Sequence, residues 1–454
     1  MMVSLFANDT ACRRLILVSL IAVFFCVDTT AEDHQVSFRG DVAPILIKHC
    51  VACHCARKAE GSYRIDSFDG LLKTGDSGIA PFSTADTGDE KMVEFLRRLT
   101  TEDESERMPL EGKPLDDSEV KMIEQWIREG VSYDAKDPRA LLQQILPSQQ
   151  YPSPPEQYPA TIPITAIEFL PAGNELITGG YHEVLIWSLD GQLKRRIQNM
   201  GQQVFSINLH PDGKRVAIAS GQPGREGDVR ILDLLTGEIE ATLARSADVI
   251  FDAVFSHDGK LLAVAGADKS IRLIDLESLE ETQVILSHAD FVTSLAWSGD
   301  DRQLVSGSRD KSAKVFDVES GQLLGSYQGH GAAVRGVGFV SNDTEAISSG
   351  ADGKLHRWKI EATKKIAEVS LGGEGFKITS SSSWVLVPTN HHQVMQVDPV
   401  GNKVLATLSG QKDWALSSAT NSDATLAASG AHNGEVNIWK IEGQELVHSW
   451  FAKP

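Results

Sequence analysis

The amino-acid sequence predicts a multidomain protein, with a small helical domain over residues 32–137 and an all-β repeat domain over residues 160–454. Three observations support this division. Two segments of the first region carry apolar residues at helical spacing. Residues 151–159 contain four prolines, and the region after them carries β-like segments that recur every 39 to 45 residues. A chain of 454 residues, of which 41% are hydrophobic, is long enough to bury two separate cores.

The composition excludes several classes of protein. The chain has 43 Lys and Arg against 62 Asp and Glu, which gives a formal net charge of −19. This balance argues against a nucleic-acid partner, because binding to phosphates depends largely on Lys and Arg. Five cysteines in the whole chain are too few for a disulfide scaffold.

The N-terminus predicts export from the cytoplasm. Arg13 and Arg14 precede an apolar run over residues 15–27, which is followed by a short polar stretch ending at Ala31. This is the layout of a secretory signal peptide, here residues 1–31. A permanent membrane anchor is the alternative, but the run is shorter than the roughly 18 residues that a spanning helix needs. We therefore expect a mature protein without a stable membrane span, located in the periplasm or elsewhere outside the cytoplasm.

A cysteine motif near the start of the mature chain predicts a cofactor. The segment Cys50-Val51-Ala52-Cys53-His54 has the form CxxCH. In this motif two thiols form thioethers with the haem vinyl groups, and the adjacent imidazole binds the iron. A zinc site would need a second pair of Cys or His ligands, and a redox CxxC would need a surrounding βαβ pattern. The motif predicts one covalently attached haem c, held by Cys50 and Cys53, with His54 as an axial ligand. No role is predicted for Cys55.

The second axial ligand of the predicted haem is expected to be Met108. A single c-type haem usually takes a ligand from each side. Met92 and Met122 lie in segments with helical spacing, where methionine is more often a core residue. Met108 precedes Pro109, which biases it towards an extended conformation in which its thioether can point at the iron. His34 is a further alternative.

The haem motif is one of several motifs in a set order, which lie at residues 38–46, 50–54, 61–66, 75–78, 107–109 and 126–130. With these motifs, roughly residues 35–131 resemble the planctomycete-type cytochrome c domain. The resemblance implies a small all-α haem domain with His54 and Met108 as axial ligands. The chain departs from the family pattern at Asp76, where the family usually has a second glycine, and at Leu110, where it usually has a second proline.

An acidic run lies directly before Met108, at residues 102–106. The simpler interpretation is a solvated loop. As a further hypothesis, this acidic rim lies beside the haem edge and favours a basic redox partner through electrostatic steering. Beyond the haem domain, residues 138–159 are predicted to form a proline-rich linker, because closely spaced prolines make a chain stiff and extended.

The repeat of the second domain is marked by pairs of residues at the ends of β-like segments. These pairs are Trp187-Ser188, Leu232-Asp233, Ile274-Asp275, Phe316-Asp317, Trp358-Lys359, Val397-Asp398 and Trp439-Lys440. Their spacing matches the 40 to 45 residues of a propeller blade. Residues 160–454 therefore resemble a WD-repeat β-propeller with seven blades. A single blade cannot bury both faces of its sheet, so the seven are expected to stack in a closed ring.

Two repeats keep polar residues that, in this family, brace a blade through hydrogen bonds. These residues are His330, Ser348, Asp352 and Trp358 in one repeat, and His288, Ser306 and Asp310 in the repeat before it, where Phe316 replaces the tryptophan. Since the set recurs once per repeat, a structural role is favoured over a Ser-His-Asp catalytic set. The adjacent pair His391-His392 is not expected to bind metal, because neighbouring residues on a strand point to opposite faces.

Taken together, the sequence predicts an exported monohaem c-type cytochrome that acts in electron transfer, with the propeller as a protein-interaction scaffold. The alternative is a haem-dependent oxidoreductase whose propeller binds a substrate or second cofactor. The propeller sequence shows no convergent set of acids, bases or metal ligands, so an electron carrier is preferred over an enzyme. The expected partners are a basic redox protein and proteins that dock on the propeller.

Overall fold

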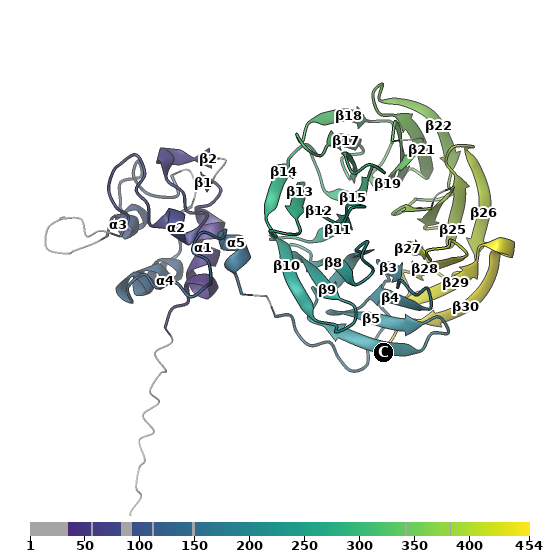
Figure 1. The fold of residues 1–454 in the computed structure, drawn as a ribbon, viewed down its shortest axis with the longest axis horizontal. Coiled ribbons are helices and arrows are strands. Elements are labelled where there is room, and N and C mark those ends of the chain that lie inside the picture. The colour runs from purple at the N-terminus through teal and green to yellow at the C-terminus, as the bar shows by residue number, and fades with distance from the viewer. Residues whose placement is uncertain are drawn as a thin grey trace, which may run out of the picture. The chain divides into compact units, whose positions relative to one another are not determined.

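A computed structural model describes residues 35–55, 58–82, 93–110, 113–147, 150–340, 343–381 and 383–454. The chain divides into two compact units, residues 1–142 and residues 143–454 (Figure 1). The predicted signal peptide, His34 and Met92 lie outside the described residues. Among the residues that are described, no helix combines the length and the apolar character needed to cross a membrane.

The N-terminal unit is built mainly from short helices. Its elements are η1 (Phe38–Val42), α1 (Ala43–His49), β1 (His54–Cys55), β2 (Lys58–Ala59), η2 (Glu60–Ser62), α2 (Phe68–Leu71), α3 (Glu94–Thr100) and α4 (Asp117–Arg128), and α5 (Leu142–Ile145) begins at its end. The expectation of an all-α domain is therefore right only in part. The chain reverses direction after the cysteine motif, and His54 pairs with Ala59 in a two-stranded hairpin. The order of the sequence motifs, on which the all-α expectation was based, does not indicate this reversal.

The longest helix of this unit, α4, has a clear local cause. The carboxylate of Asp116 accepts hydrogen bonds from the backbone N–H groups of Ser118 and Glu119, and Glu119 bonds back to the Asp116 N–H. This capping box satisfies donors that would otherwise be unpaired at the first turn. On the inner face of the helix, Trp126 is fully buried, and its ring centroid lies 5.3 Å from that of Phe38. The aromatic contact holds α4 against η1.

The C-terminal unit is a ring of seven antiparallel sheets, each made of four consecutive strands (Figure 1). Blade 1 contains β3 (Ile167–Phe169), β4 (Glu175–Gly179), β5 (Glu183–Ser188) and β6 (Leu193–Gln198). Blade 2 contains β7 (Gln203–Leu209), β8 (Arg215–Gln222), β9 (Glu226–Asp233) and β10 (Ile239–Ser246). Blade 3 contains β11 (Ile250–Phe255), β12 (Leu261–Gly266), β13 (Ile271–Asp275) and β14 (Glu281–Ile285).

The remaining four blades repeat this order. Blade 4 contains β15 (Val292–Trp297), β16 (Gln303–Ser308), β17 (Ala313–Asp317) and β18 (Leu323–Tyr327). Blade 5 contains β19 (Val334–Val340), β20 (Glu345–Gly350), β21 (Lys354–Lys359) and β22 (Lys364–Ser370). Blade 6 contains β23 (Thr379–Ser380), β24 (Val385–Thr389), β25 (Gln393–Asp398) and β26 (Lys403–Ser409), and blade 7 contains β27 (Ala415–Thr420), β28 (Leu426–Ala431), β29 (Glu435–Lys440) and β30 (Glu445–Phe451).

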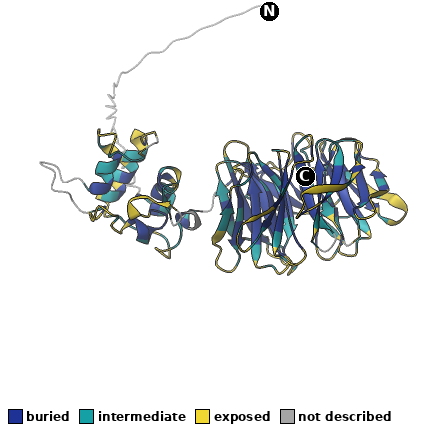
Figure 2. Cartoon of the chain, turned by 90° about the horizontal axis from the view of Figure 1, so that it is seen from above, coloured by how far each residue is buried: buried dark blue, intermediate teal, exposed yellow. Residues whose placement is uncertain are grey.

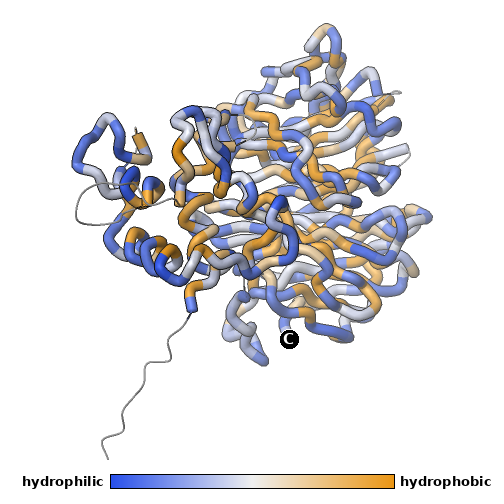
Figure 3. Tube along the Cα trace, turned by 60° about the vertical axis from the view of Figure 1, so that its left-hand side comes forward, coloured by the Kyte–Doolittle hydropathy of each residue, from blue (hydrophilic) through white to orange (hydrophobic). Residues whose placement is uncertain are grey.

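The predicted seven-bladed propeller is confirmed. Every residue pair that marked the repeat in the sequence ends the third strand of its blade. These third strands are buried for most of their length, whereas the fourth strands are more exposed (Figure 2). Figure 3 shows hydrophobic residues along the strands and hydrophilic ones in the loops between them. Neighbouring blades pack against each other through a common cluster of buried side chains. Ile186 of blade 1 and Ile218 of blade 2, for example, belong to one such cluster.

The ring closes between blade 7 and blade 1 through hydrogen bonds and packing. The Ile164 N–H donates to the Ala431 carbonyl at 3.0 Å, and the Ser417 hydroxyl donates to the Ile164 carbonyl at 2.7 Å. Leu185 of blade 1 and Ile438 of blade 7 belong to the same buried cluster. Closure leaves no sheet face of these two blades without a neighbour, which is the main stabilising feature of a propeller.

The predicted linker, residues 138–159, is divided between the two units. At its start, the Pro138 carbonyl accepts a hydrogen bond from the Asp69 N–H of the N-terminal unit. Near its end, Tyr151 is buried on the propeller, where its N–H donates to Asn199 and its hydroxyl donates to Asp228. Both ends are therefore held by contacts, each to a different unit.

Candidate functional site

A cavity of about 590 Å³ in the N-terminal unit brings the predicted haem residues together. Cys50, Cys53, His54 and Met108 all line it, although Met108 follows the cysteine motif by more than fifty residues. Most of the remaining wall is apolar and includes Ile65, Phe95 and Leu99. A cavity of this size with a few convergent polar and sulfur groups is typical of cofactor sites.

A tight turn places both thiols and the imidazole on this cavity. Helix α1 ends at the cysteine motif, and the N–H groups of Cys53 and His54 both donate to the Cys50 carbonyl, at 3.2 and 3.1 Å. Cys50 is buried and Cys53 is half-buried, and neither forms a disulfide. Burial raises the pKa of the Cys50 thiol to about 12. Because neither cysteine is in a disulfide, both sulfur atoms are available to form thioethers.

The hydrogen bond of His54 determines which ring nitrogen can bind a metal. Its Nδ1 lies 3.1 Å from the backbone carbonyl oxygen of Tyr63. Because a carbonyl only accepts, Nδ1 carries the proton and Nε2 keeps a free lone pair. The Tyr63 hydroxyl donates to the Leu71 carbonyl at 2.7 Å, which holds Tyr63 in place. His54 is thus oriented for Nε2 ligation, which is common for imidazole ligands.

The loop that carries Met108 is attached to helix α3. The Met108 N–H donates to the Arg98 carbonyl at 2.8 Å. At the start of the helix, the buried Glu94 carboxylate accepts hydrogen bonds from Arg97 at 2.7 and 2.9 Å and from Arg98 at 2.8 Å. The hydrogen bonds from Arg97 lower the pKa of Glu94 to about 2. Arg97 also donates to Glu106 at 2.7 Å, so the helix and the loop share one ion-pair network.

Met122 and the other donor side chains near the cysteine motif differ from Met108 in position. Met122 lies on α4 and does not line the cavity in the described part of the chain. His49 lines the cavity, but it lies on α1 beside the cysteines, and its Nε2 is 3.0 Å from Glu119. Cys55 pairs with Lys58 in the hairpin. Met108 is therefore the methionine that the described structure places at the cavity.

The residue types around the cavity fit a c-type haem. Two thiols, an imidazole with a free Nε2 and a thioether supply the donors that its attachment and iron ligation need. Sequence reasoning did not identify Tyr63, Glu94 or Arg98, which also line this cavity. The charged residues of α3 stand three and four positions apart, a spacing that allows ion pairs. No local signal marks Tyr63, since its role depends on a carbonyl nine positions away from His54.

The acidic run before Met108 is less negative than its sequence suggests. Glu106 pairs with Arg97 at 2.7 Å, and Glu104 lies 3.5 Å from Arg107. The Asp103 carboxylate accepts hydrogen bonds from Ser105. Part of the negative charge is therefore compensated within the domain, which weakens the steering hypothesis and favours a structural role for this loop.

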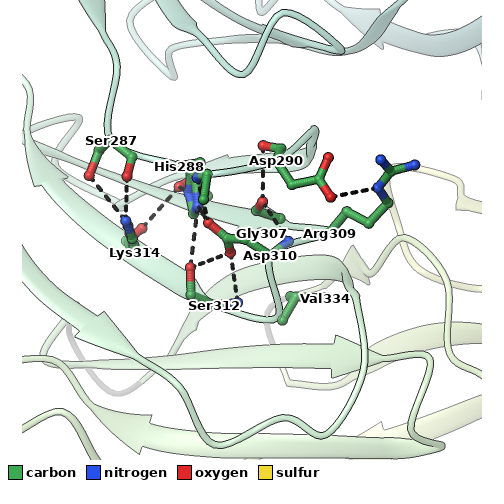
Figure 4. Close-up of polar contacts among 12 residues, drawn as sticks. Ser287, His288, Asp290, Gly307, Arg309, Asp310, Ser312, Lys314 and Val334 are labelled. Atoms are coloured by element: carbon green, nitrogen blue, oxygen red, sulfur yellow. Dashed lines mark hydrogen bonds and ion pairs between the residues drawn. The ribbon is translucent and has the colours of Figure 1, made fainter.

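The polar sets of the propeller are internal to their blades, as expected. In blade 4, Nδ1 of His288 lies 2.9 Å from Asp310 and its Nε2 lies 2.7 Å from the Ser306 hydroxyl (Figure 4). In blade 5, His330 makes the same contacts with Asp352 at 3.0 Å and Ser348 at 2.8 Å. These hydrogen bonds connect the loop before each blade to its second strand and to the turn that follows.

The expected tetrad of blade 5 is incomplete. The indole N–H of Trp358 is buried without a hydrogen-bond partner among the described residues, and its ring stacks on Tyr327 at 5.0 Å. His356 adds a second imidazole, which stacks on His330 at 4.1 Å with an angle of 17° between the rings. Two imidazoles stacked in this way cannot both direct a lone pair at one ion. His330 also uses both ring nitrogens in hydrogen bonds, so the cluster is structural.

The pair His391-His392 lies in the exposed turn between β24 and β25, not on a strand. The argument from strand geometry was therefore wrong for this pair. Neither histidine belongs to a group of three or more metal-ligand side chains in the described parts of the chain.

The comparisons with known families match both units. Residues 50–112 match the family model of planctomycete cytochrome C. Residues 237–275, 279–317 and 321–359 match the model of the WD domain, G-beta repeat. Each of these matches begins near the fourth strand of one blade and ends with the third strand of the next, so the sequence repeat is offset from the structural blade by one strand. No curated protein matches the chain significantly. The chain thus joins a domain similar to planctomycete cytochrome C to a seven-bladed propeller that contains WD repeats.

Proposed function

We propose that this chain is an exported monohaem c-type cytochrome that transfers electrons, and that its propeller is a scaffold for protein partners. The observation that carries the proposal is the convergence of Cys50, Cys53, His54 and Met108 on one cavity. When bound, haem c supplies a one-electron redox couple. The family match of residues 50–112 supports the same cofactor class.

Each residue of the cavity has a separate role in this proposal. Cys50 and Cys53 attach the cofactor covalently, and the backbone turn between them keeps their spacing. His54 ligates through Nε2, because its Nδ1–H is held by Tyr63. Met108 ligates from the loop that α3 holds in place. A haem held by both His54 and Met108 would be suited to electron transfer rather than substrate turnover, because both side chains would occupy the iron.

The location outside the cytoplasm is part of the same proposal. The signal-like layout of residues 1–31 directs the chain to the compartment where haem is attached to CxxCH motifs. The WD-repeat propeller supports protein partners, since its rigid ring presents loops from seven blades. The proposed electron-transfer partner is a redox protein, and other proteins are proposed to dock on the propeller.

Covalent haem attachment can be tested directly. The full chain is produced in a host that attaches haem, and covalent haem per chain is measured after denaturation. We expect one haem in the wild-type protein and none in Cys50→Ala/Cys53→Ala, whereas the matched control Cys55→Ala keeps it. Wild-type protein without covalent haem would overturn the proposal.

Axial ligation is tested with Met108→Ala. We expect the variant to bind external ligands at the iron and to have a lower reduction potential, because thioether ligation raises the potential. Met122→Ala is the matched control and should change neither property. A wild-type iron with an open axial position, together with peroxide-dependent turnover, would instead favour the haem-dependent oxidoreductase.

A further inference from the structure

The central channel of the propeller contains a cavity of about 690 Å³. Its walls are supplied by the innermost strands of all seven blades, which surround the channel axis in Figure 1. The cavity extends into the loops that follow these strands, as Gly299 and Asp343 show, so it lies towards that mouth of the channel. Its volume falls in the range of small-molecule sites.

An ion pair across the channel forms one end of this cavity. Lys377 precedes β23 in blade 6, and its ammonium group lies 2.5 Å from Asp252 of β11 and 3.1 Å from the Ser206 hydroxyl of β7. The Asp252 side chain is fully buried, and its carboxylate also accepts bonds from the Ser206 hydroxyl and the Leu295 N–H. An ammonium group has three N–H donors. Two are used here, and the side chain of Lys377 is 35% exposed, so the third can serve a ligand in the cavity.

A carboxyl group faces the same cavity from blade 1. Glu168 of β3 lines the cavity, and one of its oxygens accepts the Phe169 N–H at 3.2 Å. Within the described chain its other oxygen has no hydrogen-bond partner. Burial raises the pKa of Glu168 to about 7, although the charge of Lys377 acts in the opposite direction. Carboxyl groups perturbed in this way inside a cavity are typical of binding sites.

The charges around the cavity restrict what can bind. Glu168 and Asp343 line the cavity and disfavour an anion, because the nearby ammonium group of Lys377 is already paired with Asp252, and that ammonium group in turn disfavours a metal dication. A hydroxyl group both donates and accepts, so it can bond to the carboxyl and ammonium groups together. Further hydroxyl side chains line the cavity, among them Ser380 and Ser418. This environment is complementary to a molecule that carries several hydroxyl groups and no charge.

We infer that the propeller channel is a binding site for a neutral polyhydroxylated small molecule, of the size of a mono- or disaccharide, held by Glu168 and Lys377. The inference is independent of the proposed electron transfer, because none of the channel residues belongs to the N-terminal unit.

The test uses the purified full chain and isothermal titration calorimetry. The probes are glucose, sucrose, maltose and glycerol, with citrate and calcium chloride as charged comparisons. We expect at least one of the neutral probes to bind and the charged probes not to bind. Binding of citrate or calcium alone, or of no probe, would overturn the inference.

Variants then locate the site. Glu168→Gln changes the carboxyl group to a neutral amide of nearly the same size, and Glu168→Leu removes its hydrogen bonds. We expect Glu168→Leu to weaken sugar binding about tenfold, which corresponds to a lost hydrogen bond. The matched control is Glu240→Leu on the exposed outer strand β10. Equal binding by both Leu variants would contradict the inference. Should Glu168→Leu fail to fold, Glu168→Gln decides, with a smaller loss expected. Binding should persist in Cys50→Ala/Cys53→Ala, which separates this test from that of the proposed function.

Discussion

The two units of the chain use histidines in opposite ways. In the propeller, His288 and His330 each have both ring nitrogens bonded to side chains of their own blade. In the N-terminal unit, Nδ1 of His54 bonds to a backbone carbonyl, and no described residue is a partner of Nε2 at the cavity. A histidine with two protein partners stabilises a fold, whereas one with a single partner is prepared to bind a ligand.

The two units also differ in how their buried side chains are distributed. The propeller has a buried cluster between each pair of neighbouring blades, so its stability is distributed around the ring. In the described part of the N-terminal unit, the side chain of Trp126 contacts three aromatic rings, those of Phe38, Phe68 and Phe82. A single loss should therefore be felt much more in the smaller unit.

The largest effect is expected for Trp126→Ala. Truncating a fully buried aromatic side chain costs about 3–5 kcal/mol, a large part of the 5–15 kcal/mol that stabilises a typical domain. In differential scanning calorimetry, the transition of the N-terminal unit should move to much lower temperature or disappear, while that of the propeller stays in place. Trp414→Ala, at a position that is 44% exposed, serves as the control. A shift of the propeller transition by Trp126→Ala would show that the two units do not unfold independently.

Acid should destabilise the propeller before the N-terminal unit. Burial lowers the pKa of His288 and His330, and lowers that of His356 to about 4. The unfolded chain therefore takes up protons near pH 6.5 that the folded propeller does not, and stability is lost as the pH falls from about 6.5 to about 4. The histidines alone contribute a loss of about 1–3 kcal/mol over this range, which the raised pKa of Glu168 partly offsets because its carboxyl group takes up a proton in the folded chain. Glu94 has its pKa lowered to about 2, so its contribution to the smaller unit is lost only between about pH 4.5 and pH 2.

Thermal unfolding followed at a series of pH values checks this order. His356→Gln should make the propeller less sensitive to pH between 6.5 and 4 and should leave the N-terminal unit unchanged. An N-terminal transition that falls first on acidification would contradict the assignment of these groups.

For His330→Ala we expect a loss of propeller stability that is smaller than that of Trp126→Ala and no larger than that caused by acid. The substitution leaves Ser348 and Asp352 without their histidine partner inside a blade, which costs about 1–3 kcal/mol. Denaturant titration should show the loss in the propeller, and covalent haem content should remain that of the wild-type protein. Reduced haem content in this variant would mean that the histidine acts beyond its own blade.

The smallest effect on stability is expected for Glu106→Gln, which breaks the ion pair between Glu106 and Arg97. Partly exposed ion pairs contribute only about 0.2–1 kcal/mol. Because this pair connects α3 to the loop of Met108, the variant should bind external haem ligands faster than the wild-type protein, even though it unfolds at nearly the same temperature. Glu104→Gln, whose partner Arg107 lies 3.5 Å away, is the matched control and should have no such effect. If the wild type and both variants bind external ligands at the same rate, the ion pair of Glu106 does not hold the loop of Met108 in place.

The features that the sequence could predict are local or periodic. The CxxCH motif places two thiols and an imidazole within five residues, so its chemistry can be read without a fold. The seven blades follow from a regular spacing, because each blade repeats the same order of four strands. Met108 became the candidate ligand through the effect of the next residue, Pro109, on the backbone, and the structure places it at the cavity. The all-α prediction failed at the hairpin of β1 and β2, where no such local signal exists.

What only the tertiary structure decided is the set of contacts between distant residues. The tautomer of His54 depends on the Tyr63 carbonyl, and the position of Met108 depends on a hydrogen bond to α3. At the polar end of the channel, Lys377 forms an ion pair with Asp252, which lies 125 residues away in the sequence. Residue type and spacing specify which groups the chain carries and how it repeats. Closure of the ring and packing of the helices decide which of those groups meet, because such contacts arise only when chain segments far apart in sequence are brought together.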